Sequence, residues 1–131
     1  MQLDGIHHAA IICSDYAKSK RFYAEILGLG VLQENFQSAR GSFKLDLALP
    51  DGGQIELFHI PGAPKRPSYP EALGLRHLAF RVTDVAKARE ELLAFGLRVE
   101  DVRIDPYTGR RFVFFSDPDD LPLELYECPP G

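Results

Sequence analysis

The amino-acid sequence predicts an α+β fold made of two tandem βαβββ modules, and three observations lead to this prediction. The stretch at 8–15 is repeated in plan at 77–84, since each copy opens with histidine, alternates small and apolar residues and reaches aspartate seven positions later. Ile-Glu-Leu-Phe at 55–58 is matched by Leu-Glu-Leu-Tyr at 123–126. The two opening histidines are 69 positions apart and the two closing glutamates are 68 apart. The chain therefore consists of two copies of one structural unit.

Length and composition limit the classes of protein to which the chain can belong. Its 131 residues suffice for one core of ordinary size, or for two half-domains that share one, and are too few for two independent domains. Hydrophobic residues make up 45% and charged residues 26%, as in soluble globular proteins. A net charge of -4 without a dense basic cluster argues against a nucleic-acid partner.

The sequence also bears on location and redox state. The first residues lack the basic leader and apolar stretch of a signal peptide, and no apolar run approaches the roughly 20 residues that cross a bilayer. We therefore expect a cytoplasmic protein without a membrane partner. Cys13 and Cys128 have neither metal-finger spacing nor the density of a disulfide scaffold, so we expect both to be reduced and without a role in the chemistry.

In the first module we expect a strand at 3–12, a helix at about 16–27 and strands near 31–36, 43–49 and 54–60. Ser14 or Asp15 can cap the helix, and Gly28 suits its left-handed exit. Five residues at helical spacing share one side of this helix: Ser19, Phe22, Tyr23, Ile26 and Leu27. Asp51-Gly52-Gly53 forms the hairpin turn before the last strand.

A proline-rich connector at 61–73 separates the modules, because its four prolines cannot continue a ladder or a helix interior. The second module repeats the order, with a strand at 75–82, a helix at about 85–95 and strands near 97–103, 111–115 and 121–127. Gly96 ends this helix as Gly28 ends the first. Neither module alone buries both faces of a four-stranded sheet, so the two sheets should join around a shared interior.

Strand alternation selects the residues that carry chemistry. We expect His8 and His77 to point to the concave side, where an alanine two positions after each would leave space for a bound molecule. We expect His7, on the other face, to be a hydrogen-bonded structural residue. Glu56 and Glu124 lie at the centres of apolar strands, and their neighbours take the core side: Ile55, Leu57, Leu123 and Leu125. Burying an unpaired carboxylate is costly, and a divalent cation shared with the two imidazoles would compensate both.

These residues resemble the metal centre of the vicinal oxygen chelate (VOC) superfamily, and specifically of its glyoxalase I-like (lactoylglutathione lyase-like) branch. The resemblance covers about residues 3–127. In that branch one metal ion is bound by a residue on the first and last strand of each module, and the matching positions are His8, Glu56, His77 and Glu124. Asp117-Pro118-Asp119 resembles the family's turn into the final ligand strand, and Asp120 stands where glycine is usual.

The resemblance implies a single VOC domain over residues 1–131. Module 1 would span about 3–60, the connector 61–73 and module 2 about 74–127, with a shared curved sheet around a metal cavity. It implies one divalent ion per site, with nickel or cobalt favoured, zinc next, and manganese or iron as further candidates. It also implies a homodimer, because two chains commonly complete the site in this superfamily, although one chain holds both halves and could close on itself.

The implied reaction is a lyase or isomerase step on a hemithioacetal of a 2-oxoaldehyde, or on a similar small substrate with vicinal oxygens. Glu124 would take a proton from the carbon beside the carbonyl. Glu56 would be the second carboxylate ligand and a candidate acid or base. Arg81, Phe58 and Tyr126 share faces with the ligands and are candidates for substrate binding. For Arg81, a solvent-facing or glutamate-paired position is an equal alternative.

One departure from the family pattern concerns the substrate. Glutathione-using members carry an arginine four residues after the first metal histidine and an asparagine four residues after the first metal glutamate. This chain has Ile12 and Ile60 there. The metal centre is therefore matched better than the glutathione site, and another thiol, or a small metabolite without a thiol, is an open alternative.

The ligand set also ranks other functions. An epimerase of the methylmalonyl-CoA kind uses four ligands but has glutamine where Glu56 stands. Extradiol dioxygenases and fosfomycin-type thiol transferases use three protein ligands, so a fourth counts against them. A small-molecule-binding module without metal, as in bleomycin-sequestering relatives, is the non-catalytic alternative. In such a module the four residues would form an ion-pair network.

Overall fold

The computed structural model describes residues 1–130 and divides the chain into two compact units, Met1–Lys65 and a second unit that begins at Arg66. The first unit is module 1 and the second is module 2. The boundary lies inside the proline-rich segment at 61–73. No helix within the described residues is long and apolar enough to span a bilayer.

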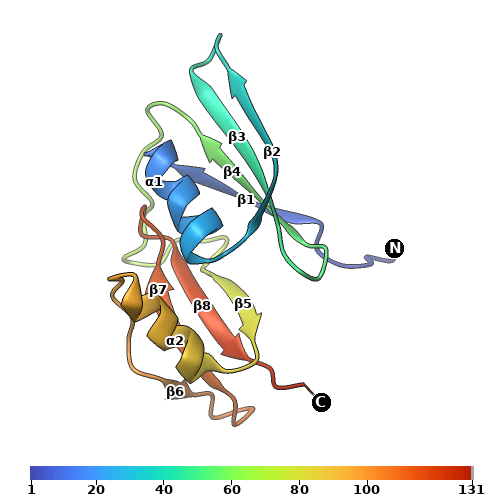
Figure 1. Ribbon diagram of the computed structural model, residues 1–131, viewed down its shortest axis with the longest axis vertical. Helices are drawn as coiled ribbons and strands as arrows, with labels where there is room; N and C mark the ends of the chain where they lie inside the picture. The colour runs from blue at the N-terminus through green and yellow to red at the C-terminus, as the bar shows by residue number, and fades with distance from the viewer. Residues whose placement is uncertain (131) are drawn as a thin grey trace. The chain divides into compact units, whose positions relative to one another are not determined.

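Module 1 contains one helical segment and one mixed sheet of four strands (Figure 1). Its elements are β1 (His8–Cys13), α1 (Tyr16–Lys20) continued by η1 (Arg21–Ile26), β2 (Gly30–Gln37), β3 (Ser42–Ala48) and β4 (Gln54–His59). The strand order is β1-β4-β3-β2. Strand β1 runs parallel to β4, and the other neighbours are antiparallel.

Module 2 repeats this plan. Its elements are β5 (Leu78–Val82), α2 (Val85–Ala94), β6 (Arg103–Ile104), β7 (Arg111–Ser116) and β8 (Pro122–Glu127). The strand order is β5-β8-β7-β6, with β5 parallel to β8 and the other neighbours antiparallel. Each strand of module 1 thus has its counterpart at the same place in module 2. The predicted α+β fold of tandem βαβββ modules is confirmed.

Both helices begin after an aspartate, which at the first helix is one of the two predicted caps, and both end near the predicted glycine. The carboxylate of Asp15 accepts a hydrogen bond from the backbone N three residues on, and Asp84 does the same, at 3.1 Å in each case. Gly28 and Gly96 have φ angles of 74° and 84°. Glycine adopts this left-handed conformation without steric cost, so it can turn the chain out of the helix.

The first helix differs from the prediction, because it is α-helical only over Tyr16–Lys20. Over Arg21–Ile26 it widens into a π-helix, and the N of Leu27 bonds to the carbonyl of Phe22 five residues back at 2.9 Å. In this wider turn the adjacent rings of Phe22 and Tyr23 are both buried, in edge-to-face contact with centroids 5.0 Å apart.

The first strand of each module is shorter than predicted. Strand β1 begins at His8 because its partner β4 begins opposite it, at Gln54, and residues 3–7 are exposed. In module 2, β5 begins at Leu78 instead of residue 75.

The strand predicted at 97–103 is reduced to the two residues of β6. In its place, the carboxylate of Glu100 accepts a hydrogen bond from the backbone N of Phe114 at 2.9 Å. A side chain therefore accepts a bond that a neighbouring strand would accept in a regular ladder.

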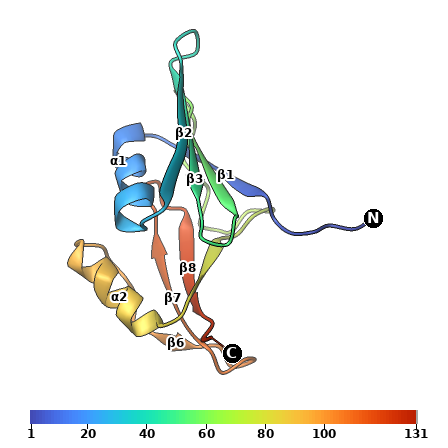
Figure 2. The same cartoon turned by 45° about the vertical axis from the view of Figure 1, so that its right-hand side comes forward.

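The core of each module lies on the side of the sheet that its helix covers. Figure 2 views the sheet of module 1 nearly edge on, with α1 along one side of it. Alternate residues of the central and closing strands are buried on that side: Leu45, Leu47, Ile55, Leu57, Val113, Leu123 and Leu125. Because side chains alternate along a strand, Glu56 and Glu124 project from the opposite face, as predicted.

Candidate functional site

Each module brings a histidine and a glutamate together on the face opposite its core. The pairing of β1 with β4 sets Glu56 across from the alanine two residues after His8. The pairing of β5 with β8 sets Glu124 across from the alanine two residues after His77. In module 1, Nε2 of His8 lies 3.3 Å from Oε2 of Glu56. In module 2, Nε2 of His77 lies 3.9 Å from Oε1 of Glu124.

The pair in module 1 belongs to a charged cluster. Nζ of Lys44 lies 3.2 Å from Oδ1 of Asp46 and 3.6 Å from Oε1 of Glu56. The hydrogen bond to Asp46 raises the pKa of Lys44. Nδ1 of His7 lies 2.9 Å from Nδ1 of His8, so His7 is hydrogen-bonded as expected and the other ring nitrogen of His8 meets the carboxylate.

The pair in module 2 lies against aromatic rings. The side chain of Glu124 is 13% exposed, and burial raises the pKa of its carboxyl, although nearby arginines act in the opposite direction. The ring of Phe114 meets that of His77 edge to face, with centroids 4.9 Å apart. Nδ1 of His77 is buried and has no hydrogen-bond partner among residues 1–130.

The two modules differ at matched positions around their glutamates. Across the strand pairs, Glu56 faces Asp46, whereas Glu124 faces Phe114. Two residues before Asp46, module 1 has Lys44. Two residues before Phe114, module 2 has Phe112. At these matched positions module 1 therefore offers charged side chains and module 2 aromatic ones. The aromatic surface suits the carbon skeleton of a bound molecule.

The donors in both modules fit a divalent metal ion in chemical type. Nickel, cobalt, zinc, manganese and iron all accept imidazole nitrogen and carboxylate oxygen. The half-buried carboxyl of Glu124 and the unpartnered ring nitrogen of His77 are consistent with a further binding partner in module 2. Within neither module, over residues 1–130, do three or more His, Cys, Asp or Glu side chains gather at metal-binding spacing. Each module thus offers two donors, and the set of four stays a prediction.

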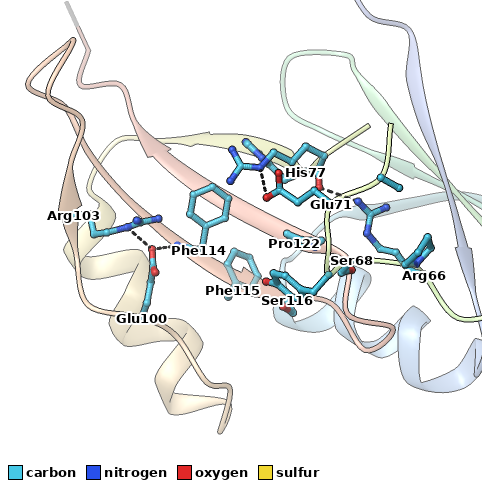
Figure 3. A pocket seen from close by; sticks show the side chains of 14 residues that line it. Arg66, Ser68, Glu71, His77, Glu100, Arg103, Phe114, Phe115, Ser116 and Pro122 are labelled. Atoms are coloured by element: carbon cyan, nitrogen blue, oxygen red, sulfur yellow. Dashed lines mark hydrogen bonds and ion pairs between the residues drawn. The ribbon is translucent and has the colours of Figure 1, made fainter. Parts of the chain in front are cut away.

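Module 2 contains two cavities beside its histidine. One, of about 310 Å³, is lined by the segment at 66–77 and by β7 (Figure 3). The other, of about 370 Å³, also borders Glu124 and Tyr126. The two cavities have four lining residues in common: Arg76, His77, Arg103 and Phe114. In Figure 3 the ring of Phe114 stands between Arg103 and His77.

The three residues predicted to contact substrate have different surroundings. Tyr126 lines the larger cavity, and its hydroxyl donates a hydrogen bond to Oδ2 of Asp105 at 2.9 Å and is bonded to Thr108. Phe58 is half-buried on β4 of module 1. Arg81 is exposed on β5 and lines neither of the two cavities.

Sequence reasoning did not find Arg76, Arg103 or Phe114. Arg76 directly precedes His77, so alternation assigns it to the opposite face, but β5 begins only at Leu78 and alternation does not hold before it. Arg103 is the last residue of the strand predicted at 97–103, and the sequence pattern does not show which side of that strand faces the core. In the repeat, Phe114 occupies the position that corresponds to Asp46 of module 1. This correspondence is the sequence signal that could have identified Phe114.

Known proteins resemble the chain along most of its length. A family model described as Glyoxalase/Bleomycin resistance protein/Dioxygenase superfamily matches residues 5–125. The uncharacterized protein YwkD of Bacillus subtilis (strain 168) is 58% identical, over 97% of this chain and 99% of YwkD. A 2-epi-5-epi-valiolone epimerase of Actinomyces sp is 31% identical, over 96% of this chain and 80% of the epimerase. A crystal structure of the glyoxalase family protein from Enterococcus faecalis has a TM-score of 0.89 at 47% identity, over 97% of this chain and 100% of that chain.

Proposed function

The chain belongs to the Glyoxalase/Bleomycin resistance protein/Dioxygenase superfamily, and from that premise we propose that it is a metal-dependent lyase or isomerase of the glyoxalase I type. Members of this superfamily commonly bind a divalent metal ion and a small-molecule substrate. The observation that carries the proposal is the His-Glu pair that recurs at matching strand positions in both modules.

We assign His8, Glu56, His77 and Glu124 as the ligands of one divalent ion. Nickel or cobalt is our first choice, from the resemblance to short bacterial-type chains, and zinc is the next. A bound ion would polarise a substrate carbonyl and stabilise the negative charge that develops on its oxygen. Two imidazoles and two carboxylates on the sheet faces opposite the module cores support this assignment, since one cation compensates both acids.

We assign Glu124 as the base. Its carboxylate borders the larger cavity of module 2, so it can accept a proton from the carbon beside a substrate carbonyl and return it to the neighbouring carbon. Burial of its side chain raises its proton affinity, which suits this role. Glu56, beside Lys44, is the second carboxylate ligand and a candidate acid or base for the opposite hand of the substrate.

The proposed substrate is a hemithioacetal of a 2-oxoaldehyde or a similar small molecule with vicinal oxygens. Ile12 is 51% exposed and Ile60 is 43% exposed, so both are accessible yet neither offers a polar group to a tripeptide thiol. We therefore favour a thiol other than glutathione, or a small metabolite that carries no thiol.

Metal analysis of the protein after mild purification is the first test. Turnover of methylglyoxal with glutathione and with other thiols is the second.

Glu124→Gln keeps the size of the side chain and removes the base, so we expect kcat to fall by at least about 100-fold. Glu91→Gln, on an exposed position of α2, is the matched control and should retain full activity. The absence of a bound ion, or unchanged turnover by Glu124→Gln, would remove the basis of the proposal.

Epimerisation is the second candidate, and the 31% identical 2-epi-5-epi-valiolone epimerase favours it. The same base would then remove a proton beside a carbonyl, and the proton would return to the other face of the same carbon. Turnover in D₂O separates the two reactions. Deuterium on the original carbon with inverted configuration indicates an epimerase, whereas a proton moved to the neighbouring carbon indicates glyoxalase chemistry.

A further inference from the structure

We propose that module 2 binds the anionic group of a small substrate, a carboxylate or a phosphate, through Arg103 and Arg76 beside His77. The inference rests on the proposed function in one respect, namely that the bound molecule is a substrate. It adds the charge class of that substrate, which the four predicted metal ligands do not define.

Arg103 is held in an orientation that suits anion binding. Its Nε donates a hydrogen bond to Oε1 of Glu100 at 3.0 Å, and Glu100 is itself fixed by the backbone N of Phe114. The guanidinium carbon lies 4.8 Å from the ring centroid of Phe112 and 5.4 Å from that of Phe114. A guanidinium anchored at Nε over aromatic rings presents its two terminal nitrogens as a planar fork. Carboxylates and phosphates bind such a fork bidentately.

Arg76 adds a second positive charge at both cavities. Its Nε donates to Oε1 of Glu71 at 3.0 Å, so this side chain is anchored in the same way as Arg103. Arg66 also lines the smaller cavity, and it donates to the backbone carbonyls of Leu75 and Arg76 at 3.0 and 2.9 Å. Because these carbonyl oxygens are neutral, they do not compensate the positive charge of Arg66. With three arginines and two glutamates in its lining, the smaller cavity favours an anion.

The arginines are poorly explained as stabilising ion pairs. In the pair of Arg103 with Glu100 the side chains are 54% and 36% exposed, and in the pair of Arg76 with Glu71 they are 68% and 57% exposed. Ion pairs this exposed contribute between nothing and about 1 kcal/mol to stability. Their placement around one histidine is better explained by ligand binding.

Position and size define the ligand further. Both cavities share the two arginines and His77, and the larger one reaches Glu124. An anionic group on the arginines therefore leaves the rest of the molecule beside the proposed base. Volumes of about 310 and 370 Å³ lie at the low end of the roughly 300–1,000 Å³ typical of ligand sites. The site therefore suits a small metabolite whose apolar part contacts Phe112 and Phe114.

Calorimetric titration of the protein as purified, with its own metal content, tests the inference with three probes. Pyruvate and hydroxyacetone share a three-carbon skeleton and a carbonyl but differ in the carboxylate, and inorganic phosphate separates phosphate from carboxylate recognition. We expect pyruvate or phosphate to bind at least about tenfold more tightly than hydroxyacetone. Arg103→Gln should weaken anion binding at least about tenfold, and Arg103→Lys should restore part of it.

Arg98→Gln removes the same charge from an exposed position of module 2 and should leave anion binding unchanged. Thermal unfolding verifies that each variant is folded, and Arg76→Gln replaces Arg103→Gln if the latter is not. Equal binding of pyruvate and hydroxyacetone, or equal anion binding by Arg103→Gln and the parent protein, overturns the inference.

Titration of Glu124→Gln keeps this inference distinct from the proposed function. Arginine-dependent anion binding that persists in a protein without bound metal supports the inference while the proposed function fails. Anion binding that disappears in Glu124→Gln and survives in Arg103→Gln assigns the anion to the metal centre. That result overturns the inference and leaves the proposed function standing.

Discussion

The carboxylate of Glu127 accepts a hydrogen bond from the backbone N of Val85 at 2.9 Å, which ties the last strand of module 2 to the first residue of its helix. The same carboxylate pairs with Arg111, with Nη2 2.8 Å from Oε2. The hydrogen bond from Arg111, followed by the one from Val85, holds the pKa of Glu127 below its usual value. Glu127 therefore stabilises the module in its ionised form.

Glu127→Gln should lower the free energy of unfolding near neutral pH and have a smaller effect in acid. The pKa of Glu127 is lower in the folded than in the unfolded state. Its contribution is therefore complete above the unfolded-state value of about 4.3 and is lost as the pH falls through the folded-state value. Urea unfolding of both proteins at about pH 7 and about pH 3 measures this convergence. A difference of the same size at both values would contradict it, and Glu91→Gln serves as the charge control.

Asp120→Gly should stabilise the protein by about 0.5–1 kcal/mol, because Asp120 has a φ of 64° in the turn before β8. An L-residue pays a steric penalty in this left-handed conformation, and glycine does not, although glycine loses more entropy on folding. Thermal and urea unfolding measure the gain. Asp119→Gly, one residue earlier, is the control and should destabilise. Equal effects of the two substitutions would contradict the assignment of strain to Asp120.

Leu123→Ala should cost about 2–5 kcal/mol of unfolding free energy, since Leu123 is fully buried next to Glu124 on the core side of β8. Leu93→Ala, at a position 36% exposed on α2, should cost less than about 1 kcal/mol. Denaturant unfolding of the two variants gives both values. A mild effect of Leu123→Ala would mean that the core side of β8 is less closely packed than its burial indicates.

Mixing two inactive variants tests whether two chains share a metal site. We expect a homodimer in which His8 and Glu56 of one chain act with His77 and Glu124 of the other. Random reassociation of His8→Ala with His77→Ala makes half of the dimers mixed, each with one intact site of two, so about a quarter of the activity should return. Sedimentation measures the dimer. If subunits exchange and no activity returns, all four ligands come from one chain.

Lys44→Gln should tighten the binding of a divalent ion several-fold, because it removes a positive charge 3.6 Å from Oε1 of Glu56. The effect is limited by solvent screening, since the side chain of Lys44 is 37% exposed. Competition with a chelator of known affinity measures the change. Lys87→Gln, exposed on α2, is the matched control. Weaker ion binding by Lys44→Gln would show that Lys44 supports the site instead of competing with the ion.

Local pattern was sufficient to predict the fold class and the two His-Glu pairs. The side-chain period of a strand is a property of neighbouring residues, so alternation around Glu56 and Glu124 placed both on the face away from the core. Asp15 was one of the two predicted caps of the first helix for the same reason, because a cap acts within one turn. The repeat then related the two halves to each other.

Tertiary structure decided what surrounds those pairs. The register of β7 on β8 sets Phe114 against Glu124, whereas the register of β3 on β4 sets Asp46 against Glu56. Arg76 precedes β5 and Arg103 lies in the two-residue β6, so neither belongs to a strand stretch long enough for alternation to place its side chain at these cavities. Strand register and loop conformation depend on contacts between residues far apart in the chain, and one sequence read locally does not contain them. The sequence by itself determined the two His-Glu pairs that we predict to carry the chemistry, and only the folded chain determined which charges and rings they face.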